Sequence, residues 1–247
     1  MSVNRLIVGV GACVAVLCGT TLPAAAVPLN WMNMAPTPFG TSVPNNSVYT
    51  LPGIGNVTVS YAFTGTFADS RFQNPLLLNG NVSANAYTWG NQELFAATNL
   101  GQTGQPSNWR ITYTFTSLLP GGSIYLGVSG LGRTTNNGGM MTVASVNQNG
   151  TYLGDWSGGG NYGLTQFTGG PGVFSLNNSV TGAGGADPWW NTSLAVIRID
   201  DQISSLTVNF SQLEGDGLGL NIASVPAPGP AALLGLGAAA AMRRRRR

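Results

Sequence analysis

The stretch that decides the fold is Val57-Thr58-Val59-Ser60-Tyr61-Ala62-Phe63-Thr64. Apolar and small polar side chains alternate strictly along it, and the alternation places these apolar residues on one face: Val57, Val59, Tyr61, Phe63 and Phe67. Successive side chains of a β-strand point to opposite sides, so a period of two predicts a half-buried strand. We expect Phe63 to be fully buried and Thr64 to lie on the solvent face.

The same alternation recurs through the central sequence. Similar runs lie at residues 111–115, 124–128, 195–199, 206–210 and 218–222, with shorter candidates at 141–146, 162–167 and 173–176. Glycine- and asparagine-rich turns separate them. No helical period is convincing within residues 27–224, although residues 91–100 come nearest. The pattern predicts an all-β domain, an antiparallel two-sheet sandwich with a jelly-roll-like order. A β-helix is the alternative, but no fixed repeat supports it.

Composition closes several routes to catalysis. The 247-residue chain contains neither histidine nor lysine, and its two cysteines are Cys13 and Cys18. Catalytic triads of the Ser-His-Asp or Cys-His type, Schiff-base chemistry and histidine- or thiolate-bound zinc are therefore excluded from the central domain. Residues 27–224 hold four arginines and eight acidic residues, a net charge of −4. An acidic body argues against nucleic acid as a partner.

The first 26 residues have the three parts of a secretion signal. Arg5 supplies the positive charge, residues 6–17 the apolar core, and Ala24 and Ala26 the small residues that signal peptidase requires. We predict cleavage after Ala26, which also removes both cysteines. The alternative, a permanent anchor, needs an apolar span of about 20 residues, and this one is shorter.

The last 23 residues form a second signal. They run from Val225, Pro226, Ala227 and Pro228 through an apolar segment ending at Met242 to an arginine cluster, Arg243, Arg244, Arg245, Arg246 and Arg247. This order resembles the PEP-CTERM sorting signal of exported bacterial proteins, with Ala227 in place of the usual glutamate. The alternative is a buried terminal helix, which would leave five like charges unsatisfied.

The resemblance implies an exosortase-like processing enzyme as partner. It also implies transient insertion of a hydrophobic sorting helix in the inner membrane, and release to the cell surface or extracellular matrix. The arginine cluster would stay cytoplasmic by the positive-inside rule. The chain then divides into a signal peptide at 1–26, a β-sandwich domain at 27–224 and a sorting signal at 225–247.

The remaining acids and aromatics are the candidate site residues. Carboxylates that could form a glycosidase pair are Asp200, Asp201, Glu214 and Asp216. Glu214 and Asp216, in a glycine-rich loop, are also candidate calcium ligands. For all four, the alternative is an ordinary turn acid. We expect no cofactor, with calcium at Glu214 and Asp216 as the alternative.

Candidate glycan-stacking residues are Trp189, Trp190 and Trp156, which lie near glycine-rich or loop-like sequence. The alternative for each is ordinary core packing. The sequence thus predicts a non-enzymatic, exported protein with a structural or adhesive role associated with exopolysaccharide. A carbohydrate-binding module is the first alternative, and a glycoside hydrolase is the second.

Overall fold

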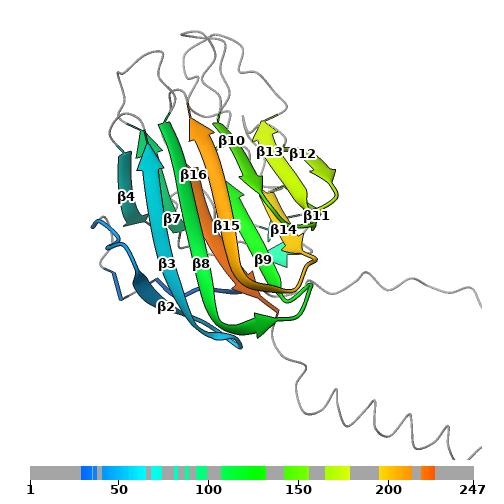
Figure 1. The fold of residues 1–247 in the computed structure, drawn as a ribbon, viewed down its shortest axis with the longest axis horizontal. Helices are drawn as coiled ribbons and strands as arrows, with labels where there is room; N and C mark the ends of the chain where they lie inside the picture. Colours follow the sequence, from blue (N-terminus) through cyan, green and yellow to red (C-terminus); the bar gives the residue numbers. More distant parts are fainter. Residues whose placement is uncertain are drawn as a thin grey trace, which may run out of the picture.

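The computed structural model describes residues 29–34, 36–37, 41–64, 68–73, 81–82, 87–88, 93–98, 107–131, 142–155, 165–178, 195–212 and 218–225. These residues form two antiparallel sheets, shown in Figure 1, and a small two-stranded sheet of β5 and β6. The predicted all-β, two-sheet architecture is confirmed. Residues 91–100, which come nearest to a helical period, contain a strand instead.

The first sheet has seven strands. In spatial order they are β11 (Gly150–Asp155), β14 (Ala195–Ile199), β9 (Ile124–Ser129), β16 (Leu218–Ser224), β7 (Glu93–Thr98) and β4 (Ala68–Gln73), with β1 (Asn30–Trp31) also paired to β16. All of these pairings are antiparallel.

The second sheet also has seven strands, and it lies in front of the first in Figure 1. Its order is β12 (Thr165–Gly170), β13 (Val173–Asn178), β10 (Thr142–Val146), β15 (Ile203–Gln212), β8 (Ser107–Leu119), β3 (Gly55–Thr64) and β2 (Ser47–Leu51). The small third sheet pairs β5 (Asn81–Val82) with β6 (Tyr87–Thr88).

Four strand pairs are nested in the sequence. The innermost is β10 with β13, followed outward by β9 with β14, β8 with β15 and β7 with β16. Successive pairs lie in alternate sheets. The chain therefore crosses between the sheets at most of its connections, and the two sheets are interleaved in the sequence.

One apolar core fills the space between the sheets. Side chains from both sheets belong to it, for example Leu126, Ile197 and Leu220 from the first and Val59 and Leu206 from the second. All five are 0% exposed. Full burial of an aliphatic side chain stabilises a fold by about 1.5–3 kcal/mol. The alternating runs of the sequence thus supply the inner faces of both sheets.

The expected full burial of Phe63 is wrong. The apolar face of β3 is assigned correctly, because Val57 and Val59 are 0% exposed, but Phe63 is 48% exposed. Its register partner Trp109 is buried and packs in parallel on Phe210, with ring centroids 6.0 Å apart. Phe63 only covers Trp109 from outside, at 5.2 Å. The core therefore ends within this row, between buried Trp109 on β8 and exposed Phe63 on β3, before the end that alternation suggested.

The outer faces of the two sheets differ. Strands β9 and β16 are buried along their whole length, on both faces. Strand β10 of the second sheet instead alternates between buried and intermediate residues, and in β8 the exposed Thr114 and Thr116 alternate with the buried Tyr113 and Phe115. Antiparallel sheets commonly keep one face in water. The described part of the second sheet does so, and it offers a broad accessible surface.

Two substitutions separate the core from its edge. Leu206→Ala removes a fully buried side chain and should lower the free energy of unfolding by about 2–5 kcal/mol. Phe63→Ala should cost about 1–2 kcal/mol, because about half of the ring already lies in water. Thr64→Ser, on the exposed face, serves as the control, with a change within about 0.5 kcal/mol. Denaturant melts provide the comparison. A Phe63→Ala cost equal to that of Leu206→Ala would contradict this boundary of the core.

Candidate functional site

Polar side chains line the outer face of β3, β8, β15 and β10. Cross-strand pairing places Ala62, Arg110, Asn209 and Ser145 in one row across these four strands. The next row consists of Thr64, Asn108, Ser211 and Val143. Because the side chains of a strand alternate, each row points away from the core. We call these two rows the open face.

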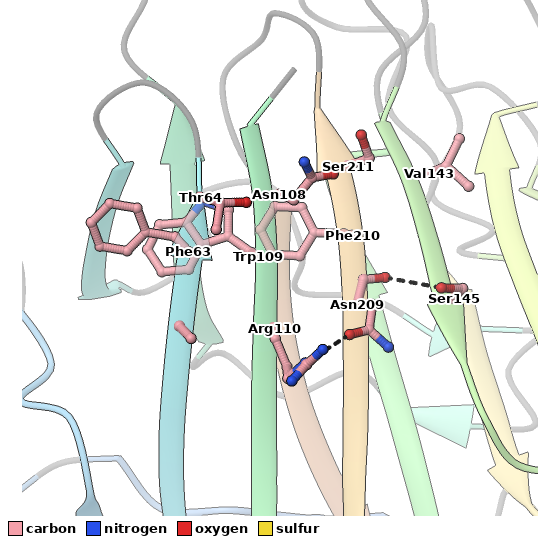
Figure 2. A pocket seen from close by; sticks show the side chains of 11 residues that line it. Phe63, Thr64, Asn108, Trp109, Arg110, Val143, Ser145, Asn209, Phe210 and Ser211 are labelled. Carbon is pink, nitrogen blue, oxygen red and sulfur yellow. Dashed lines mark hydrogen bonds between the residues drawn. The ribbon is translucent and has the colours of Figure 1, made fainter. Parts of the chain in front are cut away.

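Two adjoining hollows lie on this side of the sheet. The first has a volume of about 410 Å³ and is lined by the open face together with Phe63, Trp109 and Phe210. Figure 2 shows Arg110, Asn209 and Ser145 in front of the strands that carry them. The second hollow, of about 270 Å³, is lined by Arg110, Asn147, Gln148, Ser205, Thr207 and Asn209. Arg110 and Asn209 line both, so they stand where the hollows meet.

Hydrogen bonds hold part of the open face in place. The Arg110 Nε donates to Asn209 Oδ1 at 3.2 Å, and the Ser145 hydroxyl makes a long hydrogen bond, 3.5 Å, to the backbone carbonyl oxygen of Asn209. Both interactions are drawn in Figure 2. Asn108 and Ser211, in contrast, have no hydrogen-bonding side-chain partner within the described residues. Their amide and hydroxyl groups are therefore available to a ligand as both donors and acceptors.

The chemistry of the hollows suits binding. Among the described residues that line them, all polar side chains except Arg110 are uncharged, and none is a carboxylate. Glycoside hydrolysis by the common route needs two carboxyl groups facing the scissile bond. Amides and hydroxyls instead match the hydroxyl groups of a sugar, each of which both donates and accepts. Sequence reasoning missed this set because cross-strand register cannot be read from local alternation.

The two described acids of the predicted glycosidase group serve a turn. Asp200 accepts hydrogen bonds from Arg198 Nε and the Thr151 hydroxyl, each at 2.7 Å. Asp201 accepts from the backbone N–H of Asn149 at 2.6 Å and from its Nδ2 at 2.8 Å. These bonds tie the β14–β15 turn to the start of β11, which is the role the turn-acid alternative described.

Asn149, in the β10–β11 turn, connects the β14–β15 turn to the β12–β13 turn. Its carbonyl accepts from the Asp200 N–H at 2.9 Å, and its Oδ1 accepts from the Gly172 N–H at 2.8 Å. On the opposite side, Gly122 N–H donates to the Ile199 carbonyl at 2.7 Å, and a Cβ on Gly121 would overlap the Asp200 carbonyl. The acids thus belong to a packed cluster of turns, with their oxygens already hydrogen-bonded.

Glu93 is a buried carboxylate that the sequence did not point out. It is 3% exposed, on the outer side of the first sheet, and accepts a hydrogen bond from the Ser129 hydroxyl at 2.7 Å. Gly219 lies against both groups, and a Cβ there would overlap them. A glycine at this position therefore makes the room that Glu93 and Ser129 occupy.

Several predicted site residues lie outside the described residues. These are Trp156, Trp189 and Trp190, the loop acids Glu214 and Asp216, the signal residues Ala24 and Ala26, and the tail from Pro226 to Arg247. Val225, the first residue of the sorting motif, follows β16 directly and is exposed. In the described part of the chain, no three acidic, histidine or cysteine side chains cluster as metal ligands would. Nor does that part contain a helix long and apolar enough to cross a membrane.

Comparisons with known proteins add little. No protein-family model matches the chain, and no curated protein is significantly similar to it. A solved structure, the enzymatically active domain of tailspike protein 4 of bacteriophage CBA120, aligns with 69% of this chain at 13% identity and a TM-score of 0.30. The chain spans about a fifth of that structure, 19%. A likeness of this size shows neither a shared fold nor a shared activity.

The turn cluster predicts a pH dependence of stability. The side-chain and backbone hydrogen bonds from Asn149 lower the pKa of Asp201. A carboxyl group with a lower pKa in the folded state stabilises the fold above its unfolded pKa of about 3.9, and this contribution is lost as the pH falls through the folded value. Asp201→Asn should therefore lower the melting temperature at pH 7, and its deficit relative to the wild type should shrink at pH 3.

The neighbouring Gln202→Ala is the control, because Gln202 is exposed and uncharged. Its effect on the melting temperature should be small and equal at both pH values. A deficit for Asp201→Asn that stays constant from pH 7 to pH 3 would show that the charge of Asp201 does not support the cluster.

Proposed function

We propose that this chain is an exported, non-enzymatic protein of the cell surface or extracellular matrix, and that its β-domain holds exopolysaccharide through the open face. The observation that carries the proposal is the open face itself. It carries two adjoining hollows, the first of which is also lined by Phe63, Trp109 and Phe210. The amide of Asn108 and the hydroxyl of Ser211 have no hydrogen-bonding partner within the described residues.

The strand order supports a polysaccharide-binding role by analogy. The nested pairs put β7, β16, β9 and β14 in one sheet and β8, β15, β10 and β13 in the other. This is the order expected of a jelly roll, an architecture that hosts lectin domains among other functions. Fold alone does not assign function, so the weight of the proposal stays on the chemistry of the open face.

The absence of catalytic groups from the open face supports a non-enzymatic role. The described residues around the hollows provide no carboxylate pair, and Asp200 and Asp201 are engaged in the turn cluster. A binding surface needs only complementary donors and acceptors, which Asn108, Ser211 and Asn209 provide. Weak contacts of this kind, repeated along a polymer, can retain a protein in a matrix through avidity.

The localisation rests on the two terminal signals. Signal peptidase would cleave after Ala26, and an exosortase-like enzyme would act at the motif from Val225 to Pro228. The apolar segment would insert transiently in the inner membrane, with the arginine cluster on the cytoplasmic side. The β-domain would then be released with Val225 close to its mature C-terminus.

The binding prediction uses two substitutions on the open face. Asn108 and Ser211 are cross-strand neighbours, and both are free to contact a ligand. The secreted protein should be retarded in native gels that contain soluble polysaccharide, tested with dextran, xylan and polygalacturonate. The double variant Asn108→Ala and Ser211→Ala removes two hydrogen bonds to the ligand, each worth about 1 kcal/mol. It should therefore bind about tenfold to thirtyfold more weakly.

The control is Gln202→Ala, which lies on an exposed turn away from the open face, and thermal melts establish that all variants are folded. Retardation that survives in the double variant but is lost on changing Trp189 and Trp190 to alanine would move the site to those tryptophans. Absence of retardation by every polysaccharide would refute a polysaccharide-binding role.

The sorting prediction concerns the arginine cluster. Replacing Arg243 to Arg247 by glutamine removes the charges that keep the end of the chain cytoplasmic. We expect accumulation of unprocessed precursor and loss of protein from the cell surface, measured by immunoblots of membrane and external fractions. Normal processing in this variant would count against a sorting signal, whereas the β-domain could still bind polysaccharide.

A further inference from the structure

Arg110 occupies a distinctive position on the open face. It stands where the two hollows meet, and it is exposed. Its Nε is hydrogen-bonded to Asn209 Oδ1, and within the described residues it has no acidic partner. Arg198 provides the contrast, since its Nε pairs with Asp200 at 2.7 Å. Arg110 is therefore a positive charge whose counter-ion the described part of the protein does not supply.

The contact with Asn209 prepares this guanidinium for a ligand. A guanidinium group stays protonated at all physiological pH values and presents its five N–H donors in a rigid plane. Asn209 engages the Nε, which leaves both Nη groups available. Two parallel N–H donors match the two oxygens of a carboxylate, and such bidentate pairs are the strong, directional form of charge-assisted hydrogen bond. Asn209 fixes the plane of the guanidinium group, so the Arg110 side chain loses less conformational freedom on binding a ligand.

The surroundings of Arg110 favour a sugar acid over a small inorganic anion. The adjoining groups are amides and hydroxyls, Asn108 and Ser211 on one side and Thr207 and Gln148 on the other. The first hollow alone, at about 410 Å³, falls within the range of about 300–1,000 Å³ usual for ligand sites. A chain of sugars along both hollows would place hydroxyl groups on either side of one carboxylate.

We propose that the open face selects an acidic polysaccharide, with Arg110 binding the carboxylate of a uronic acid unit through its two Nη groups. This inference rests on the proposed function and names the class of polysaccharide. The net charge of −4 on residues 27–224 opposes any polyanion, so the contact at Arg110 must outweigh this repulsion. Charges farther away than the Debye length of about 8 Å at physiological salt are largely screened, whereas the contact at Arg110 is direct.

The test compares two polymers that share a backbone. Polygalacturonate carries one carboxylate per sugar, and its methyl ester is uncharged. The secreted protein should bind polygalacturonate about tenfold more tightly than the ester in about 0.15 M salt, and the preference should fall as salt is raised further. Arg110→Gln should remove the preference while retaining the weaker binding of the ester. Arg110→Lys, which keeps the charge but not the fork, should fall between the two.

The outcomes separate this inference from the proposed function. Equal binding of both polymers, unchanged by Arg110→Gln, would overturn the acidic preference and leave a neutral polysaccharide as the ligand. Binding of neither polymer, together with failure of dextran and xylan, would overturn both proposals. A preference for dextran sulfate over polygalacturonate would refute the assignment to a carboxylate. Thermal melts of both arginine variants establish that their folds are intact.

Discussion

Burial of one face of each sheet against the other is the constraint on which the structure depends. Residues 27–224 contain no cysteine, and no disulfide can close the domain. The nested pairs send the chain from one sheet to the other, so side chains such as Leu126 and Leu206 reach a common core from strands far apart in sequence. Apolar burial of this kind is the dominant favourable term in folding. About every second side chain of each strand belongs to this core, and the side chains between them point to the outer face of the sheet.

The two sheets use their remaining positions differently. In the first sheet, β9 and β16 are buried on both faces, and polar groups such as Glu93 and Ser129 satisfy each other in the space left by Gly219. In the second sheet, the outer positions stay accessible and carry serine, threonine, asparagine and Arg110. Polar side chains on a solvated face need no internal partner. They are therefore free to meet a ligand without loss of stability.

Local periodicity was sufficient to predict strands but not their context. The alternation from Val57 to Thr64 identified the inner face of β3 correctly, because side-chain direction follows from the backbone of a single strand. It could not show where the core stops, which depends on Trp109 and Phe210 from two other strands. Arg110 and Asn209 meet although 99 residues separate them, and their contact follows from the register of β8 with β15. The open face was for that reason hidden from the sequence.

The distribution of charge connects the fold to the proposed ligand. Within the turn cluster, Asp200 pairs with Arg198, and Asp201 accepts hydrogen bonds from Asn149. Arg110 is directed instead to a face whose described lining residues include no acid. Had an aspartate stood opposite Arg110, the pair would have been worth little on an exposed surface, and the fork would have been blocked. An arginine that is held by a neutral amide and pairs with no acid in the described part of the chain adds little to stability. Its position is explained better by an anionic group supplied from outside the chain.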